Sequence, residues 1–221
     1  RRLRRAALEA GVAIVGSIIE RDAGGLFDTA VVIDRHGEVV GRYRKSHLYP
    51  AELDHFQPGA ELAVVVLDGL HLGLAICFEH AFPEIFAELA LAGAQVVAIP
   101  SAVPRGFGYL LDLRTRARAQ DNQFFVAASN LAGDDGHTSW CGGSLIVDPR
   151  GTVLASAGAS GEAVIAAELD LSLIDRERAQ EPIWANRRPE LYRTLRGGLV
   201  VPPPSAEPSG DGHEQPPGWA K

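Results

Sequence analysis

Residues 71–100 read HLGLAICFEHAFPEIFAELALAGAQVVAIP and contain three predicted elements in succession. Leu72 to Ile76 is apolar and predicts a buried strand. A helical pattern then extends from Pro83 to about Ala92, with proline at its first turn. Val96 to Ile99 predicts a second buried strand. This order indicates an α/β fold, and it places Cys77 at the carboxyl end of the first strand, where open α/β sheets bind ligands.

Further elements are predicted on both sides of this unit. Before it we expect a helix end at Leu3 to Ala10, a strand at Val12 to Glu20, a hairpin of Phe27 to Asp34 with Val39 to Lys45, and a strand at Leu62 to Leu67. After it we expect a helix at Tyr109 to Asn122, a strand at Phe124 to Ala128, a hairpin of Ser144 to Asp148 with Val153 to Ala157, a strand at Val164 to Asp170 and a short helix at Leu171 to Gln180.

The composition is that of an ordinary globular protein, with 46% hydrophobic and 22% charged residues among 221. It excludes wholesale disorder and a coiled coil. A net charge of -7 argues against nucleic acid as the main partner. No apolar run approaches the ~18 residues of a membrane span. Because two cysteines make no disulfide framework, we expect a reducing, cytoplasmic compartment.

The ends of the sequence suggest how the chain is organised. It begins at Arg1 and contains no methionine, so we expect a processed or partial chain. We expect one domain over residues 1–196. Residues 197–221 contain six prolines with Gly, Ser and Glu and almost no apolar periodicity, which predicts a disordered tail.

Cys77 is the candidate nucleophile. It stands where a strand stops and a helix is about to begin, so free backbone N–H groups nearby can receive an oxyanion. Cys141, in Trp-Cys-Gly-Gly, lacks that context and is interpreted as structural. An ordinary thiol has a pKa near ~8.5, so a catalytic cysteine needs a base or a cation beside it.

Two kinds of partner for the thiol are present in the sequence. His80 is close in sequence to Cys77, and other histidines lie in the loop after Lys45, which would suit a Cys-His hydrolase. Alternatively, Lys45 ends an apolar strand and could present its ammonium at the same sheet edge, with Glu52 as the first carboxylate after it. Spacing alone leaves both arrangements open.

Several segments in a fixed order resemble a known family. They are Tyr43-Arg44-Lys45-Ser46-His47-Leu48, Glu52 with Phe56-Gln57-Pro58-Gly59, Gly73 to Glu79 with Phe82-Pro83-Glu84, Arg118 to Asn122, Ala127 to Asn130, Pro149-Arg150-Gly151, and Arg187 to Tyr192. Together they resemble the nitrilase superfamily of carbon–nitrogen hydrolases, in its amidase-like branch. The resemblance extends from the first residues to about Tyr192.

The resemblance implies a four-layer α-β-β-α sandwich and a Glu-Lys-Cys triad. Cys77 would be the nucleophile and Lys45 the triad lysine, with Glu52 as the assisting glutamate. Lys45 and the backbone N–H of Phe78 would hold the oxyanion. The general-base glutamate would belong to an amino-terminal strand-helix unit before Arg1. The implied reaction converts an amide to an acid and ammonia through a cysteine thioester.

The resemblance leaves other functions open. A nitrile-cleaving or carbamoyl-cleaving relative would share the same residues, and a catalytically inactive nitrilase-like scaffold would keep the fold alone. Ala81 stands where many relatives have an arginine that grips a substrate carboxylate, which favours neutral amides. A small-molecule amide and a homo-oligomer are the implied partners. No metal or cofactor site is predicted, because no spaced Cys/His cluster or phosphate-binding loop is present.

Overall fold

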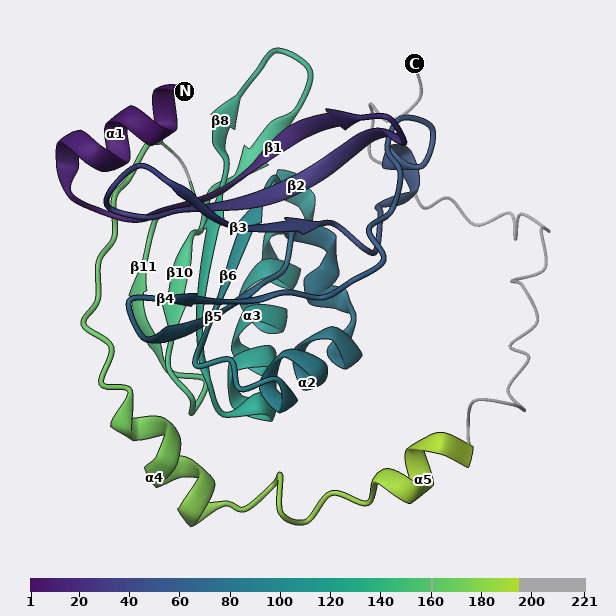
Figure 1. Cartoon of the computed structure of the whole chain (residues 1–221), viewed down its shortest axis with the longest axis vertical. Helices are drawn as coiled ribbons and strands as arrows, with labels where there is room; N and C mark the ends of the chain where they lie inside the picture. The colour runs from purple at the N-terminus through teal and green to yellow at the C-terminus, as the bar shows by residue number, and fades with distance from the viewer. Residues whose placement is uncertain (160, 195–221) are drawn as a thin grey trace.

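The computed structural model describes residues 1–159 and 161–194, which form two main β-sheets with helices outside them (Figure 1). The three-stranded antiparallel sheet contains β1 (Ile14–Asp22), β2 (Gly25–Ile33) and β3 (Val39–Arg44) in that order. The six-stranded sheet has the order β11-β10-β7-β6-β5-β4. Its strands are β4 (Val64–Leu67), β5 (Leu70–Leu74), β6 (Val96–Ser101), β7 (Phe125–Asn130), β10 (Leu145–Val147) and β11 (Val153–Ser156). Strands β5, β6 and β7 are parallel, as the strand-helix-strand order predicts.

The residues alternate along β6 between the two faces of the larger sheet. Val97 and Ile99 pack with Phe86 in a cluster that α2 (Pro83–Leu91) and α3 (Gly108–Asn122) build over one face. Val96 faces the other way, in a cluster with inner-face residues of the three-stranded sheet such as Val32. This period of two is typical of a strand buried on both sides.

A fourth layer covers the outside of the smaller sheet. Helix α1 (Arg2–Ala10) places the buried Ala7 against Val31 and Ile33 of β2 and ends at Gly11, which has a φ of +65°. The layers are therefore helix, sheet, sheet and helix (Figure 1). The predicted four-layer α-β-β-α sandwich is confirmed.

Most of the predicted elements are confirmed within one to three residues, including both hairpins and the last of the predicted helices, α4 (Ser172–Gln180). The strand predicted at Val164 to Asp170 is wrong: this segment is not part of any sheet, and Val164 is 99% exposed. An apolar pattern needs a neighbouring strand to pair with, and none pairs with it among the described residues. A ribbon of β8 (Ala132–Asp134) with β9 (Ser139–Cys141), and α5 (Pro189–Thr194), were not predicted.

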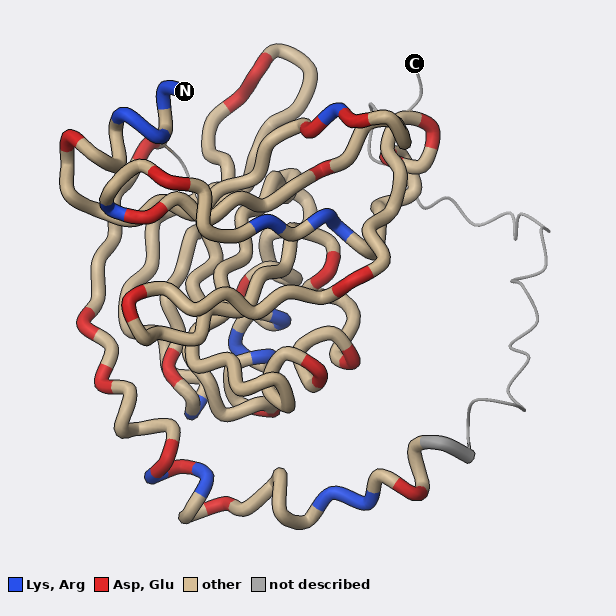
Figure 2. The backbone as a smooth tube through the Cα atoms, viewed as in Figure 1, with Lys and Arg blue, Asp and Glu red and all other residues tan. Residues whose placement is uncertain are grey.

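Charge is distributed unevenly between the strands and the rest of the chain. Strands β5, β6, β7 and β10 contain no Lys, Arg, Asp or Glu, and the tube is tan along them (Figure 2). The helices of residues 1–159 and 161–194 are too short or too polar to cross a bilayer. The tail expected at 197–221 lies outside the described residues, so the division at residue 196 stays a prediction.

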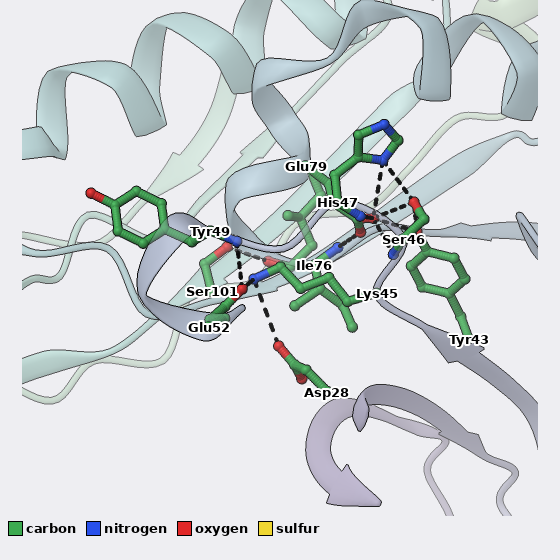
Figure 3. A network of polar contacts seen from close by, with 11 residues as sticks. Asp28, Tyr43, Lys45, Ser46, His47, Tyr49, Glu52, Ile76, Glu79 and Ser101 are labelled. Atoms are coloured by element: carbon green, nitrogen blue, oxygen red, sulfur yellow. Dashed lines mark hydrogen bonds and ion pairs between the residues drawn. The ribbon is translucent and has the colours of Figure 1, made fainter. Parts of the chain in front are cut away.

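A fully buried carboxylate, that of Glu79, connects the two sheets (Figure 3). Its Oε1 accepts hydrogen bonds from the Tyr43 hydroxyl at 2.5 Å, the Ser46 amide at 2.8 Å and the Ser46 hydroxyl at 2.7 Å. The amide of His47 donates to the same oxygen at 3.1 Å, and the Ile76 amide donates to Oε2 at 2.7 Å. Glu79 thus joins the end of β3 to the end of β5.

Glu79→Gln is expected to lower the free energy of unfolding by about 1–3 kcal/mol. Both oxygens of Glu79 accept hydrogen bonds, and in the glutamine one of them is replaced by an NH2 group that would face buried N–H or O–H donors. Urea denaturation of the variant measures the change. Glu88→Gln, an exposed carboxylate on α2, is the matched control and should stay within about 0.5 kcal/mol of wild type. Equal stability of the two variants would refute the structural role of Glu79.

Candidate active site

Cys77 is the first residue of a short 3-10 helix, η2 (Cys77–Ala81). Two residues connect this helix to the preceding strand, β5. Its φ is +46°, a conformation that a non-glycine residue seldom adopts. Such strain costs on the order of 1–3 kcal/mol and clusters at functional sites. Within this turn, the backbone N–H of Phe78 interacts with the thiol, because the first N–H groups of a helix have no partner within it. The backbone N–H of Ala102, from the loop after β6, interacts with the thiol as well.

Burial raises the pKa of the Cys77 thiol. The Lys45 ammonium and the backbone N–H groups of Ala102 and Phe78 act in the opposite direction, whereas Glu52 adds to the increase. The thiol is therefore protonated in the resting site and needs a proton acceptor before it can attack.

Lys45 follows β3 and is buried, with only 1% of its surface exposed. Its Nζ donates to both Glu52 oxygens at 2.7 Å and lies 3.8 Å from Asp28 Oδ2 (Figure 3). The Gly59 amide donates to the Lys45 carbonyl at 2.8 Å, and a Cβ at residue 59 would lie 2.1 Å from the Arg44 carbonyl oxygen. Glycine therefore lets the following loop pass close enough to fix the lysine backbone.

Glu52 ends the 3-10 helix η1 (Pro50–Glu52), where its side chain turns back on its own helix. The Tyr49 amide donates to Glu52 Oε2 at 2.7 Å, so this carboxylate has both a backbone donor and the Lys45 ammonium as partners. Three charge-assisted hydrogen bonds, two from Lys45 and one from the Tyr49 amide, hold it in one orientation.

Asp28 is a member of the site that the sequence analysis missed. It lies on β2, between Phe27 and Thr29, and its side chain is 20% exposed. Burial raises its pKa to about 6, against a usual value of 3.8; Lys45 opposes the increase, and Glu52 and Glu79 add to it. A lone carboxylate inside an apolar strand was the signal that could have identified it.

A pocket of about 390 Å³ opens over these groups, with Glu52, Cys77 and Phe78 in its wall. Most of the other lining residues are apolar: Ala51, Phe56, Ala102, Val103, Pro104, Phe107, Leu110 and Trp140. Tyr49, His80 and Arg114 complete the lining. An apolar cavity with a few polar groups converging on it is typical of a small-molecule site.

The histidines do not provide the base that the Cys-His alternative requires. His80 lines the pocket, but burial, followed by the charges of Arg114, Arg118 and Lys45, lowers its pKa to about 4, so it is a weak proton acceptor. His47 stacks on Phe82, with ring centroids 4.3 Å apart.

Cys141 is buried, and its sulfur accepts a hydrogen bond from Asn130 Nδ2 at 3.1 Å. Within residues 1–159 and 161–194, no three His, Cys, Asp or Glu side chains are grouped in a way that could hold a metal ion.

Comparison with known proteins identifies the family. The carbon–nitrogen hydrolase family model matches residues 1–179. A hydrolase of Pseudomonas protegens is 38% identical over 198 residues, covering 88% of this chain and 69% of that protein. The omega-amidase NIT2 of Xenopus tropicalis is 34% identical, with coverages of 86% and 73%.

A solved structure of an amidase from Nesterenkonia sp. AN1 is 31% identical, with a TM-score of 0.76 over 88% of this chain and 71% of that chain. The sequence and structure comparisons therefore identify the same family. The chain belongs to the carbon–nitrogen hydrolases of the nitrilase superfamily, as an amidase-like enzyme.

Proposed function

We propose that this protein hydrolyses the amide bond of a small molecule to a carboxylic acid and ammonia, through a thioester on Cys77. The observation that carries the proposal is the pocket, which has Cys77, Glu52 and Phe78 in its wall, with the Lys45 ammonium and the Phe78 backbone N–H acting on the thiol. The names of the relatives support it. One is an omega-amidase, and in a mutant of the Nesterenkonia amidase the acetamide moiety of fluoroacetamide is added covalently at the active-site cysteine.

In the proposed reaction, the Cys77 sulfur attacks the amide carbonyl carbon after a carboxylate has taken the thiol proton. Lys45 and the Phe78 N–H stabilise the oxyanion. The C–N bond then breaks, the nitrogen takes that proton back from the carboxylic acid and ammonia leaves. Water adds to the thioester carbonyl, the C–S bond breaks, and the acid is released with the thiol restored.

Glu52 has an assisting role in this proposal. Held by its bonds to Lys45, it keeps the ammonium directed at the reacting carbonyl and neutralises its charge. The general-base glutamate expected before Arg1 lies outside the sequence and stays a prediction, as do the homo-oligomer and the cytoplasmic location.

Cys77→Ala is expected to lower ammonia release from a panel of small amides by more than about 1,000-fold, because the attacking sulfur is lost. The assay uses protein expressed from the complete coding sequence, and the panel includes a nitrile and an N-carbamoyl acid. Cys141→Ala is the matched control and should retain most of the activity. In wild type, fluoroacetamide should add an acetamide group to the Cys77 peptide, as mass spectrometry can detect.

Three results would contradict the proposal. Undiminished ammonia release by Cys77→Ala would show that Cys77 is not the nucleophile. Turnover of the nitrile or the N-carbamoyl acid alone would show that the protein does not hydrolyse amides. An unreactive Cys77 together with no turnover of any panel member would favour the catalytically inactive scaffold instead.

Asp28→Asn is expected to stabilise the protein at pH 7.5. The pKa of folded Asp28 is raised from 3.8 to about 6, so its contribution to stability is complete below pH 3.8 and is lost as the pH rises through 6. Removing the ionisable group should therefore add on the order of 3 kcal/mol at pH 7.5 and almost nothing at pH 4.

Chemical denaturation at the two pH values measures this difference. Asp54→Asn, an exposed carboxylate in the loop after Lys45, is the control and should show no such pH dependence. If Asp28→Asn were equally destabilising at both pH values, a buried ionised Asp28 would be needed for the fold, and the argument from burial would fail.

A further inference from the structure

Aromatic rings from separate segments of the chain line the pocket. They belong to Tyr49 before η1, Phe56 in the loop after it, Phe78 in η2, Phe107 in the 3-10 helix η3 (Arg105–Phe107) and Trp140 in β9. Aromatic residues are only 7% of the sequence, so their meeting around one cavity is an enrichment. Such rings offer a ligand a large apolar surface with defined contact geometry.

Two of these rings hold each other in place beside the catalytic groups. The rings of Tyr49 and Phe78 pack edge to face, with centroids 5.2 Å apart and planes at 87°. The ring of Phe78 packs in the same way on Phe82, at 5.2 Å and 89°. Edge-to-face contact is a preferred geometry of aromatic pairs. Since Phe78 directly follows Cys77 and the Tyr49 amide donates to Glu52, this pair forms the reacting end of the pocket.

Trp140 presents apolar surface to the pocket. Its Nε1 donates to Asp135 Oδ2 at 3.1 Å, so the polar group of the indole is bonded to a carboxylate that is not part of the lining. The backbone of Trp140 forms an antiparallel bridge with Pro104, whose carbonyl accepts a hydrogen bond from the Phe107 amide at 2.9 Å. Trp140 and Phe107 are therefore held at one wall, and the indole has no N–H left for a ligand.

The ionisable side chains of the lining bear on the charge of the ligand. Glu52 already binds the Lys45 ammonium through both oxygens, and burial and nearby charges lower the pKa of His80 to about 4, so His80 is neutral at pH 7. Arg114 would favour a carboxylate. Because it is only half-buried, water screens its charge, whereas apolar contact with the rings suffers no such loss.

We propose that the preferred substrate is a neutral amide whose acyl group ends in an aromatic ring, which packs against Trp140 and Phe107, the ring site. The inference rests on the proposed function, because it specifies the amide that is hydrolysed. The cavity of about 390 Å³ lies near the lower end of the ~300–1,000 Å³ range of ligand pockets, which suits one ring beyond the reacting group. A neutral substrate agrees with the expectation drawn from Ala81, and the ring goes beyond it.

The test compares phenylacetamide, butyramide and succinamate, which have a ring, a methyl group or a carboxylate at the end away from the amide. With protein expressed from the complete coding sequence, kcat/KM for phenylacetamide should exceed that for butyramide about 10- to 100-fold, because more apolar surface is buried. Succinamate should be the poorer substrate than phenylacetamide. The reverse order would assign the specificity to Arg114 and overturn the proposal.

Trp140→Ala should lower kcat/KM for phenylacetamide about 10- to 50-fold, mainly through KM, because the ring loses its packing surface. Butyramide is too short to reach that wall and should change less than about 3-fold. Trp140→Phe should restore most of the preference. An equal loss with both substrates in Trp140→Ala would indicate a structural role alone and would contradict the ring site.

Trp184→Ala is the matched control. It also removes a half-buried indole, but Trp184 is not part of the lining, and its Nε1 donates to the Asn122 carbonyl at 3.3 Å. The variant should leave the ratio of the two kcat/KM values unchanged. A change of that ratio as large as in Trp140→Ala would show that the preference does not come from the ring site.

Calorimetry with the Cys77→Ala variant separates this inference from the proposed function, since it measures binding without turnover. Phenylacetamide should bind more tightly than butyramide, and adding Trp140→Ala should abolish that difference. If the two amides bind equally while wild type hydrolyses amides, the ring site is wrong and the amidase proposal stands. If phenylacetamide binds through Trp140 but no amide is hydrolysed, the ring site stands and the proposed function fails.

Discussion

The position of the active site depends on one buried carboxylate. Glu79 accepts hydrogen bonds from Ser46 on one side and Ile76 on the other, and these are the immediate neighbours of Lys45 and Cys77. The lysine and the cysteine belong to segments that leave different sheets, so their separation would otherwise depend on how the two sheets pack. Because an ionised group in a dry interior is costly unless all its donors are in place, the carboxylate restricts the two segments to a narrow range of geometries.

The same dry interior sets the protonation of the groups around Lys45. Burial raises the pKa of both Cys77 and Asp28, so each of them resists ionisation close to one ammonium. Lys45 and Glu52 already form a neutral pair. An ionised Asp28 would give this cluster a net negative charge and oppose a thiolate, whereas a protonated Asp28 would not. The pH range in which Asp28 titrates therefore bears on how readily a thiolate can form.

The sequence predicted the parts of the fold that local pattern controls. The strand-helix-strand unit of residues 71–100 has apolar runs bounded by Pro83 and Gly93, and it appears as β5, α2 and β6. Pattern failed at Val164 to Asp170, where the residues suit a strand but pairing requires a neighbour that the sequence does not reveal. The position of Arg114 in the pocket wall could not be predicted for a similar reason. Three arginines alternate along α3, and only the packing of that helix against η2 decides which of them faces the pocket.

The pairing of Lys45 also determines how it can act on a reacting group. Glu52 binds the Lys45 ammonium through two hydrogen bonds of 2.7 Å, so the cation is fixed in position while its charge acts on the Cys77 thiol. A cation that is already oriented need not reorganise when negative charge develops beside it. A mobile, solvated lysine would lose part of that advantage, because water would screen its charge.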